Sequence, residues 1–428
     1  MKKEKTGLKL YHKIFIGLFA GIIVGYILNL LGGQEHAFIG GKVLPFLQFL
    51  GNFFIKLIRM VVVPLVFFSI TESVLNLGDM KKLRGIGIKT ILMFLGTAMI
   101  AVTIGLVLAN VIKPGLGVTF TGEVAEVQMK EMTGIYDTIL NLFPSNPFES
   151  LTKGDMMPII VFSIFLGCSL LSIGDKADPV KKVIEGCSAA MFKIIDMVLV
   201  IIPYGVFGLM GNAMAVYGVA IFGPVLKFIA TDYLAAAIHT LVIYSLMLTF
   251  IAKVSPLKFW RRAFESWVIA FSTCTSAAAL PVAMKIAPEI GVPKETANFV
   301  LPLGATANMN GTCIYFGIIV IFATQLYGIE ISIQQQILLA IQATLLSVGC
   351  AAMPQVGLVI SITLLSSLGL PLEATALVAG IYRIIDQAHT STNSVGDLVT
   401  AVCVSAMEGD LDREQFEIGT KKVAGTAQ

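Results

Sequence analysis

The chain has 428 residues, of which 56% are hydrophobic and 13% are charged, and its mean hydropathy is +0.86. Soluble domains carry about 25% charged residues, so a soluble fold would lack the polar surface to cover this much apolar side chain. The net charge of +3 is too small to suggest a nucleic-acid partner. The composition therefore predicts an all-α polytopic protein embedded in membrane lipid.

Six apolar runs in the first 252 residues are long enough to cross a bilayer, and they lie near 13–32, 43–76, 87–112, 156–173, 188–217 and 220–252. A perpendicular span needs about 20 residues, so the longer runs are expected to tilt or project. Lysine and arginine gather at the N-terminus and after the second, fourth and sixth runs. This bias predicts a multi-pass protein of the cell (inner or plasma) membrane with both termini cytoplasmic.

The pattern changes after Pro256. Two segments, Phe271–Pro281 and Ile341–Gly357, are apolar at their ends and rich in small or hydroxyl residues between. They predict re-entrant hairpins, because irregular backbone at membrane depth must be buried or line a cavity. Ala297–Phe322, between them, is interrupted by Gly, Thr and Asn, and a polar helix is expected at Thr375–Met407. Paired interrupted segments of this kind indicate a transporter's binding site near the midplane.

One stripe of polar residues is predicted on the last helix, where the spacing of +3, +1, +3 and +4 keeps five side chains on one face: Asp386, His389, Thr390, Asn393 and Asp397. A carboxylate at membrane depth normally faces a cavity, a partner or a cation. The alternative is an amphipathic end beyond the membrane, but apolar sequence continues through Leu398–Val404. His389 has its own alternative, a hydrogen-bonded structural histidine.

The break in the segment between the hairpins carries Asn308 and Asn310 on either side of Met309. An unwound helix exposes carbonyl oxygens, which suit sodium, a hard cation that prefers oxygen ligands. The alternative is a simple kink whose amides cap free backbone groups.

These motifs resemble the glutamate/aspartate transporter family of dicarboxylate and amino-acid:cation symporters. The marks are the serine-rich tip before Leu280-Pro281-Val282, the N-M-x-G-T break at 308–312, and the stripe that ends Asn393-Ser394-Val395-Gly396-Asp397. The resemblance implies a homotrimer of protomers with eight transmembrane helices and two re-entrant hairpins. A transport domain would slide elevator-fashion against a scaffold, with the second hairpin as the external gate.

The expected domains follow from this resemblance. Residues 1–112 would hold scaffold helices and the first part of the transport domain, and 113–255 an external loop with the remaining scaffold and connecting helices. Residues 256–410 would form the core transport domain, and 411–428 a cytoplasmic tail.

The resemblance also implies the ligand sets. Asp386 with Thr390 would hold a substrate α-amino group, and Asn393 with the backbone around Ser276 its α-carboxylate. The substrate set further includes Thr275, Thr312, Met353 and His389. One sodium site would use Asp397, Asn308, Asn393 and the Gly304 carbonyl. A second would use Thr306 and the Ser347, Val348 and Cys350 carbonyls.

Two departures from the family pattern change the expected ligands. His389 occupies the position of the arginine that grips an acidic side chain, so we expect a small neutral or polar amino acid such as Ser, Thr or Ala. The rival is Asp or Glu held by protonated His389. Asn310 replaces an aspartate of the third sodium site, where Phe94 and Ala98 also replace hydroxyls, so that site is expected to be absent or altered.

Two other classes fit the sequence less well. An ion channel needs a continuous polar pore lining rather than two hairpin tips around a pocket. An enzyme needs a nucleophile–base pair or a metal-ligand set, and none appears. The expected function is therefore sodium-coupled symport of a small-molecule amino acid.

Overall fold

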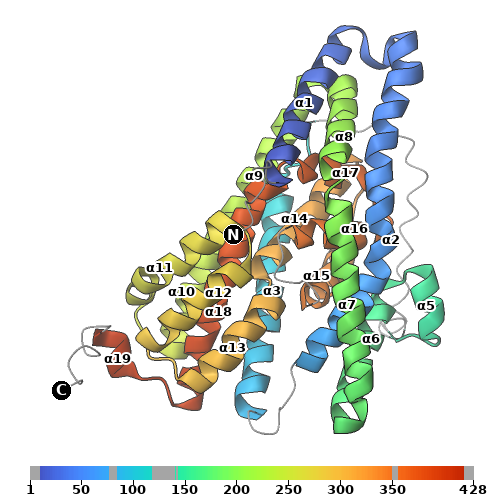
Figure 1. The fold of residues 1–428 in the computed structure, drawn as a ribbon. Helices are drawn as coiled ribbons and strands as arrows, with labels where there is room; N and C mark the ends of the chain where they lie inside the picture. Colours follow the sequence, from blue (N-terminus) through green and yellow to red (C-terminus); the bar gives the residue numbers. More distant parts are fainter. Residues whose placement is uncertain (1–9, 77–83, 118–139, 141–142, 349–354, 419–428) are drawn as a thin grey trace, which may run out of the picture.

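Helices are the regular secondary structure of the residues that the computed structural model describes, which are 10–76, 84–117, 140, 143–348 and 355–418 (Figure 1). No strand occurs among them, so the all-α prediction is confirmed. The first half contains α1 Leu10–Leu30, α2 Leu44–Asn76, α3 Arg84–Ile112, α5 Pro147–Lys153, α6 Met156–Ser172, α7 Asp178–Leu199, α8 Ile202–Tyr217 and α9 Phe222–Ala237. Helix α9 continues through η5 Ile238–Ile243, α10 Tyr244–Met247 and η6 Leu248–Ala252.

The second half contains the predicted interrupted elements. Its helices are α11 Pro256–Thr273, α12 Ser276–Glu289, α13 Lys294–Ala307, α14 Asn310–Leu326, α15 Ile333–Val348, α16 Val356–Ser367, α17 Glu373–Ala379, α18 Tyr382–Glu408 and α19 Arg413–Ile418. Helices α11 and α12 form the first hairpin, and α13 and α14 the broken helix. Helices α15 and α16 flank the expected second tip, of which residues 349–354 lie outside the described part.

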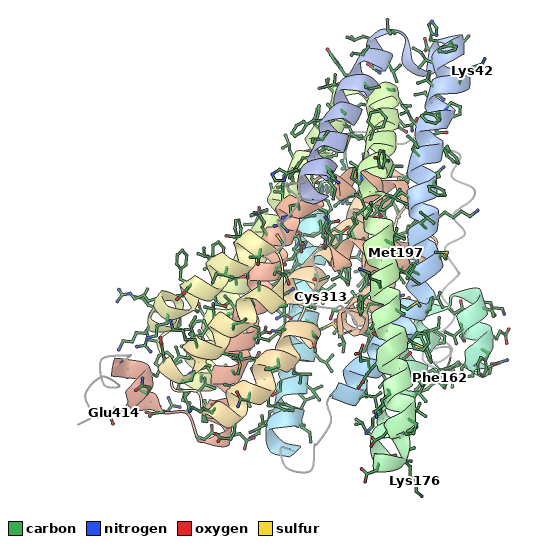
Figure 2. The ribbon with its side chains drawn as sticks, viewed as in Figure 1. Lys42, Phe162, Lys176, Met197, Cys313 and Glu414 are labelled. Atoms are coloured by element: carbon green, nitrogen blue, oxygen red, sulfur yellow. The ribbon has the colours of Figure 1, made fainter. Side chains whose placement is uncertain are left out.

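Within the described residues, four helical segments are long and apolar enough to cross a membrane: His12–Leu30, Gly85–Ile112, Ile202–Ala252 and Lys294–Leu326. Large apolar side chains such as Phe19, Phe49 and Met197 are exposed, at 59%, 59% and 64%. Figure 2 shows Met197 between Lys42 and Lys176, which lie at opposite ends of the molecule. An apolar belt between charged ends suits a bilayer. The count of eight spans stays a prediction.

Two of the predicted elements are wrong in detail. The run 188–217 is not one helix, because α7 ends at Leu199 and α8 begins at Ile202 with Pro203 in its first turn. Proline lacks an N–H and is accepted there but not in a helix interior. The run Thr375–Met407 is also split, because Gly380 and Ile381 separate α17 from α18. Both repeated units therefore end in a broken helix.

Helix α3 packs along α14 although the two are far apart in the chain, and Figure 1 shows α3 beside the broken helix. A Cβ added at Gly105 of α3 would overlap the carbonyl oxygen of Ile314, so only glycine permits this approach. Helix α18 packs against α9, α11, α13 and α14. This arrangement places its polar stripe among the two interrupted units.

Candidate functional site

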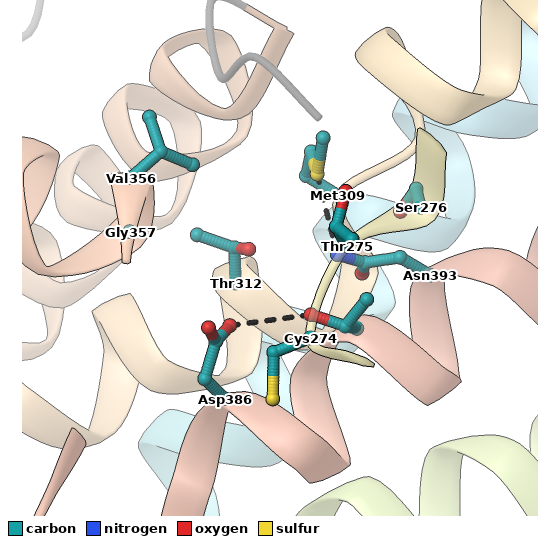
Figure 3. A pocket seen from close by; sticks show the side chains of 10 residues that line it. Cys274, Thr275, Ser276, Met309, Thr312, Val356, Gly357, Asp386 and Asn393 are labelled. Carbon is teal, nitrogen blue, oxygen red and sulfur yellow. Dashed lines mark hydrogen bonds between the residues drawn. The ribbon is translucent and has the colours of Figure 1, made fainter. Parts of the chain in front are cut away.

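A small pocket lies where the first hairpin, the helix break, α16 and α18 meet (Figure 3). Its lining is polar on the α18 side and mixed elsewhere: Cys274, Thr275, Ser276, Met309, Thr312, Val356, Gly357, Asp386, Thr390 and Asn393. Six of the eight predicted substrate residues are therefore brought together. Met353, the seventh, lies outside the described residues. His389, the eighth, is not part of this lining.

Asp386 brings a carboxylate to the pocket wall although only 7% of the residue is exposed. Its Oδ1 accepts a hydrogen bond from Thr390 Oγ1 at 3.2 Å, and its Oδ2 accepts one from the Gln355 N–H at 3.3 Å. Both of these donors are neutral, so the two hydrogen bonds bring no positive charge to the carboxylate. A buried carboxylate in this condition favours a cationic ligand group.

Asn393, two turns further along α18, fixes the helix break. Its Oδ1 accepts from the Gly311 N–H at 2.7 Å, and its Nδ2 donates to Met309 Sδ at 3.2 Å (Figure 3). The amide thus holds the first turn of α14 against α18. A substitution here would release the break as well as remove a donor from the pocket.

Helices α12 and α16 begin at residues of the pocket wall, Ser276 and Val356. The first backbone N–H groups of a helix lack partners within it and carry partial positive charge. Two such ends at one pocket suit a carboxylate. The pocket therefore offers one wall for a cation and another for an anion, the pattern that an α-amino acid requires.

His389 turns toward α9 instead. Its Nε2 lies 2.8 and 2.9 Å from the two carboxylate oxygens of Asp232, and both residues are almost completely buried. The prediction that His389 contacts the substrate gains no support from the pocket lining. Asp232 was missed from the sequence, although a carboxylate inside the apolar run 220–252 was a usable signal.

Arg383, one turn before Asp386, closes the first hairpin. Its guanidinium donates to the carbonyl oxygens of Ser272 and Thr273, each at 3.1 Å. These are carbonyls of the last turn of α11, which lack intrahelical partners. The next residue, Cys274, has a left-handed φ of 54° and is buried against the pocket. Arg383 therefore ties the hairpin tip to α18.

The first predicted sodium site is partly assembled. Asp397 Oδ1 accepts from Asn308 Nδ2 at 2.9 Å, while Asn308 Oδ1 is buried and has no hydrogen-bond partner. The helix at Gly304 approaches so closely that a Cβ there would overlap the Asp397 carboxylate. A carboxylate beside an unsatisfied amide oxygen fits a hard cation. Asn393, the fourth predicted ligand, is engaged with Gly311 and Met309.

The second predicted sodium set is less complete. Thr306 Oγ1 donates to the Leu303 carbonyl at 3.0 Å, and Ser347 Oγ donates to the Thr344 carbonyl at 2.7 Å. Val348 is the last residue of α15. Cys350 lies outside the described residues, so this set stays a prediction.

Asn310 belongs to a separate, closed network. Its Nδ2 donates to Tyr244 Oη at 2.9 Å and to Thr97 Oγ1 at 3.2 Å, and Tyr244 Oη donates to the Thr392 carbonyl at 3.0 Å. The amide of Asn310 is therefore hydrogen-bonded by neutral groups, at the position where the third sodium site was expected to be absent or altered. Tyr244 was not identified from the sequence, because a tyrosine in an apolar helix is usually a core residue.

The comparisons with known proteins cover nearly the whole chain. The profile of the sodium:dicarboxylate symporter family matches residues 10–407. A proton/sodium-glutamate symport protein of Geobacillus stearothermophilus is 36% identical over 94% of this chain and 95% of its own length. A proton/glutamate-aspartate symporter of Escherichia coli strain K12 is 33% identical over 96% of both chains. A C4-dicarboxylate transport protein of Rhodospirillum rubrum is 27% identical over 96% of this chain and 92% of its own.

Proposed function

Because this chain belongs to the sodium:dicarboxylate symporter family, we propose that it couples a cation gradient to the uptake of an α-amino acid. It is a membrane-embedded secondary active symporter and not an enzyme, as the sequence predicted. The observation that carries the proposal is the pocket with a buried carboxylate, Asp386, facing the ends of two helices. In this assignment Asp386, with Thr390, holds the substrate ammonium group. The N-terminal ends of α12 and α16, with Asn393, hold its α-carboxylate.

The preferred substrate is a small neutral or polar amino acid, such as Ser, Thr or Ala. An acidic side chain needs a positively charged partner in the pocket. The two basic residues nearest on α18 are both engaged elsewhere: His389 contacts Asp232, and Arg383 donates to the α11 carbonyls. A hydroxyl or methyl side chain needs no such partner. A dicarboxylate without an amino group would leave Asp386 unpaired.

A second candidate is an acidic amino acid. The names of two relatives specify glutamate, or glutamate and aspartate, and they share 36% and 33% of the aligned residues with this chain. Such a substrate would require protonated His389 to contact a side-chain carboxylate. Transport of this kind would fall as the pH rises above the range in which imidazole is charged.

Sodium is the proposed coupling ion. The support is the carboxylate of Asp397 beside the unsatisfied oxygen of Asn308 and the backbone at Gly304. The set around Thr306 and the end of α15 is proposed as a second site. The third family site is proposed to be absent, because Asn310, Thr97 and Tyr244 satisfy one another.

The remaining proposals concern the oligomeric state, the orientation in the membrane and the movement during transport. We propose a homotrimer in the cell membrane, with N- and C-termini cytoplasmic and an elevator movement of the part formed by residues 256–410. The repeated hairpin and broken-helix units support the proposed movement, since paired interrupted segments mark the ligand-binding part of many transporters.

The test is uptake into proteoliposomes that contain the purified full-length protein. Labelled serine, alanine, aspartate and glutamate are each offered with an inward sodium gradient, with potassium in its place as the control. Strong serine or alanine uptake that aspartate does not compete supports the neutral substrate. Uptake of aspartate or glutamate alone overturns it in favour of the second candidate. Large unitary currents without saturable uptake would instead indicate a channel.

A further inference from the structure

A second cavity, of about 250 Å³, lies outside the substrate pocket, between the α9–η5 segment, α11 and α18 (Figure 1). Helix α11 contributes four aromatic side chains to its wall: Trp260, Phe264, Trp267 and Phe271. They are three or four residues apart, so they share one face of the helix. The last three rings form a row, with centroids 5.8 Å apart for Phe264 and Trp267 and 4.9 Å apart for Trp267 and Phe271. The cavity therefore has a continuous aromatic wall along α11.

The hydroxyl groups around this cavity are hydrogen-bonded within the protein. Tyr233 Oη donates to the Ile384 carbonyl at 2.7 Å. The hydroxyls of Thr240 and Thr392 lie 2.9 Å apart, and Ser391 Oγ donates at 3.0 Å to a carbonyl of its own helix, α18. Water needs about two to four polar partners to occupy a buried cavity. The cavity therefore suits hydrocarbon better than water or a polar ligand.

The cavity opens onto an apolar part of the outer surface. Leu241 of η5 and Phe264 of α11 line it and are also 59% and 58% exposed. The side chains of Leu257 and Val268, on α11, are apolar and exposed as well. In a membrane-embedded protein such an opening faces lipid hydrocarbon, which can enter from the side. Empty space of this size forfeits packing contacts, and a lipid chain that fills it restores them.

Positive charge gathers where α11 begins. Four basic residues and no acidic one fall between residues 253 and 262: Lys253, Lys258, Arg261 and Arg262. Lys258 contacts the carboxylate of Glu417, and Arg262 donates to two backbone carbonyls at 3.2 and 2.8 Å. Arg261 is exposed and makes no hydrogen bond or ion pair with the part of the chain that the structure describes. It lies one turn before Phe264 on the same side of α11, so its charge is available beside the opening.

An apolar cavity beside an available guanidinium requires a ligand with a hydrocarbon tail and an anionic head. Arginine binds phosphate through paired hydrogen bonds, and groups of Lys and Arg at the membrane border attract anionic lipids. We propose that the cavity holds one acyl chain of an anionic phospholipid whose phosphate is bound by Arg261. The lipid fills the space between one arm of the first hairpin, α11, and α18, the helix that carries Asp386. The proposal does not depend on which substrate is transported.

The first test uses the unaltered protein. Trp260 and Trp267 are the two tryptophans of the chain, so its tryptophan fluorescence reports on this cavity. The purified full-length protein is placed in phosphatidylcholine vesicles with a small, increasing share of phosphatidylglycerol that carries brominated acyl chains, which quench on contact. The expected quenching saturates and exceeds that given by brominated phosphatidylcholine at the same share. Equal quenching by the two lipids overturns the proposal.

The second test locates the phosphate. Arg261→Gln is expected to raise the half-saturating share of brominated phosphatidylglycerol by about fivefold, because one basic residue near the membrane surface is lost. The matched control is Lys182→Gln, which removes an exposed basic residue of α7, a helix that does not line the cavity. Saturation that is unchanged in Arg261→Gln, or weakened equally in both variants, overturns the assignment of the phosphate.

The third test locates the acyl chain. Ala237 lines the cavity and is exposed, so Ala237→Leu adds side-chain volume there without crowding the interior. This variant is expected to lose the saturable part of the quenching while its thermal unfolding is unchanged. Saturable quenching that persists in Ala237→Leu overturns the placement of the chain. A brominated fatty acid that quenches more strongly than the phospholipid would overturn the proposal in favour of a free fatty acid.

Discussion

Two buried amides on either side of Met309 have opposite surroundings. Asn308 donates to Asp397 and leaves its own oxygen without a partner, whereas Asn310 is held by the hydroxyls of Thr97 and Tyr244. The surroundings of Asn308 leave an oxygen without a donor or a cation, whereas the hydrogen bonds of Asn310 are made by neutral hydroxyls. The comparison teaches that two asparagines of one helix break can differ in what they offer a cation: Asn308 presents an unsatisfied oxygen beside a carboxylate, and Asn310 is satisfied by neutral hydroxyls.

The largest effect on transport should come from removing the carboxylate of Asp397, which lies beside Asn308. Asp397→Asn keeps the shape of the side chain and removes its charge. We expect sodium-driven uptake to fall by about 100-fold or more, because a hard cation then has only neutral ligands. Uptake measured over a range of sodium concentrations checks this. An unchanged half-saturating sodium concentration would show that the cation binds elsewhere.

A direct comparison of the two amides should give the next largest effect. Asn308→Ala is expected to raise the half-saturating sodium concentration by about tenfold, and Asn310→Ala by less than about twofold. The reason is that only Asn308 has an oxygen free for a cation. The two variants serve as controls for each other, since both remove a buried amide from the same break. Equal effects would abolish the distinction between the two sides.

Arg383, like Asn310, has polar groups that are hydrogen-bonded to other parts of the protein: its guanidinium donates to two carbonyls of α11. Arg383→Gln should loosen the first hairpin, because two carbonyls of α11 lose charge-assisted hydrogen bonds worth about 1.5–3 kcal/mol each. The buried thiol of Cys274 should then react several-fold faster with a thiol reagent, as followed by mass spectrometry. Arg413→Gln, which removes a donor to the Lys253 carbonyl, is the control. Unchanged labelling would mean that Arg383 does not hold the tip.

The smallest transport effect is expected at Tyr244. Tyr244→Phe removes the hydroxyl that accepts from Asn310 and donates to Thr392. We expect a loss of about 1–3 kcal/mol in stability and little change in sodium dependence. Thermal unfolding in detergent and sodium-dependent uptake, measured on the same preparation, separate the two. A marked change in sodium dependence would show that the closed network takes part in ion binding.

Much of the fold was predictable because its signals are local. The hairpin tip at Cys274 and Thr275 and the break at Asn308 and Met309 lie where small, hydroxyl and amide residues interrupt apolar sequence. Six pocket residues followed from the family motifs. The break at Gly380 was missed, because a single glycine is tolerated in many helices.

The direction of His389 was not predictable in the same way. Its partner, Asp232, is 157 residues away in the chain, and a helical stripe gives the face of a residue but not its contact on another helix. Cys274, Met309, Val356 and Gly357 were likewise missing from the predicted site, because their place in the pocket wall depends on how the hairpins and the break fold back onto α18.

The close approach of α3 to α14 has a consequence for biosynthesis. Gly105 packs against the backbone of Ile314, which lies roughly 200 residues later in the chain, so α3 leaves the ribosome long before the surface that covers it exists. At about 5–20 residues per second, the intervening stretch of roughly 200 residues takes on the order of 10–40 s to make. During that interval the glycine-bearing face of α3 must be covered by lipid or by the insertion machinery. A chain interrupted before α14 is therefore expected to be recognised by cellular quality control as unfinished.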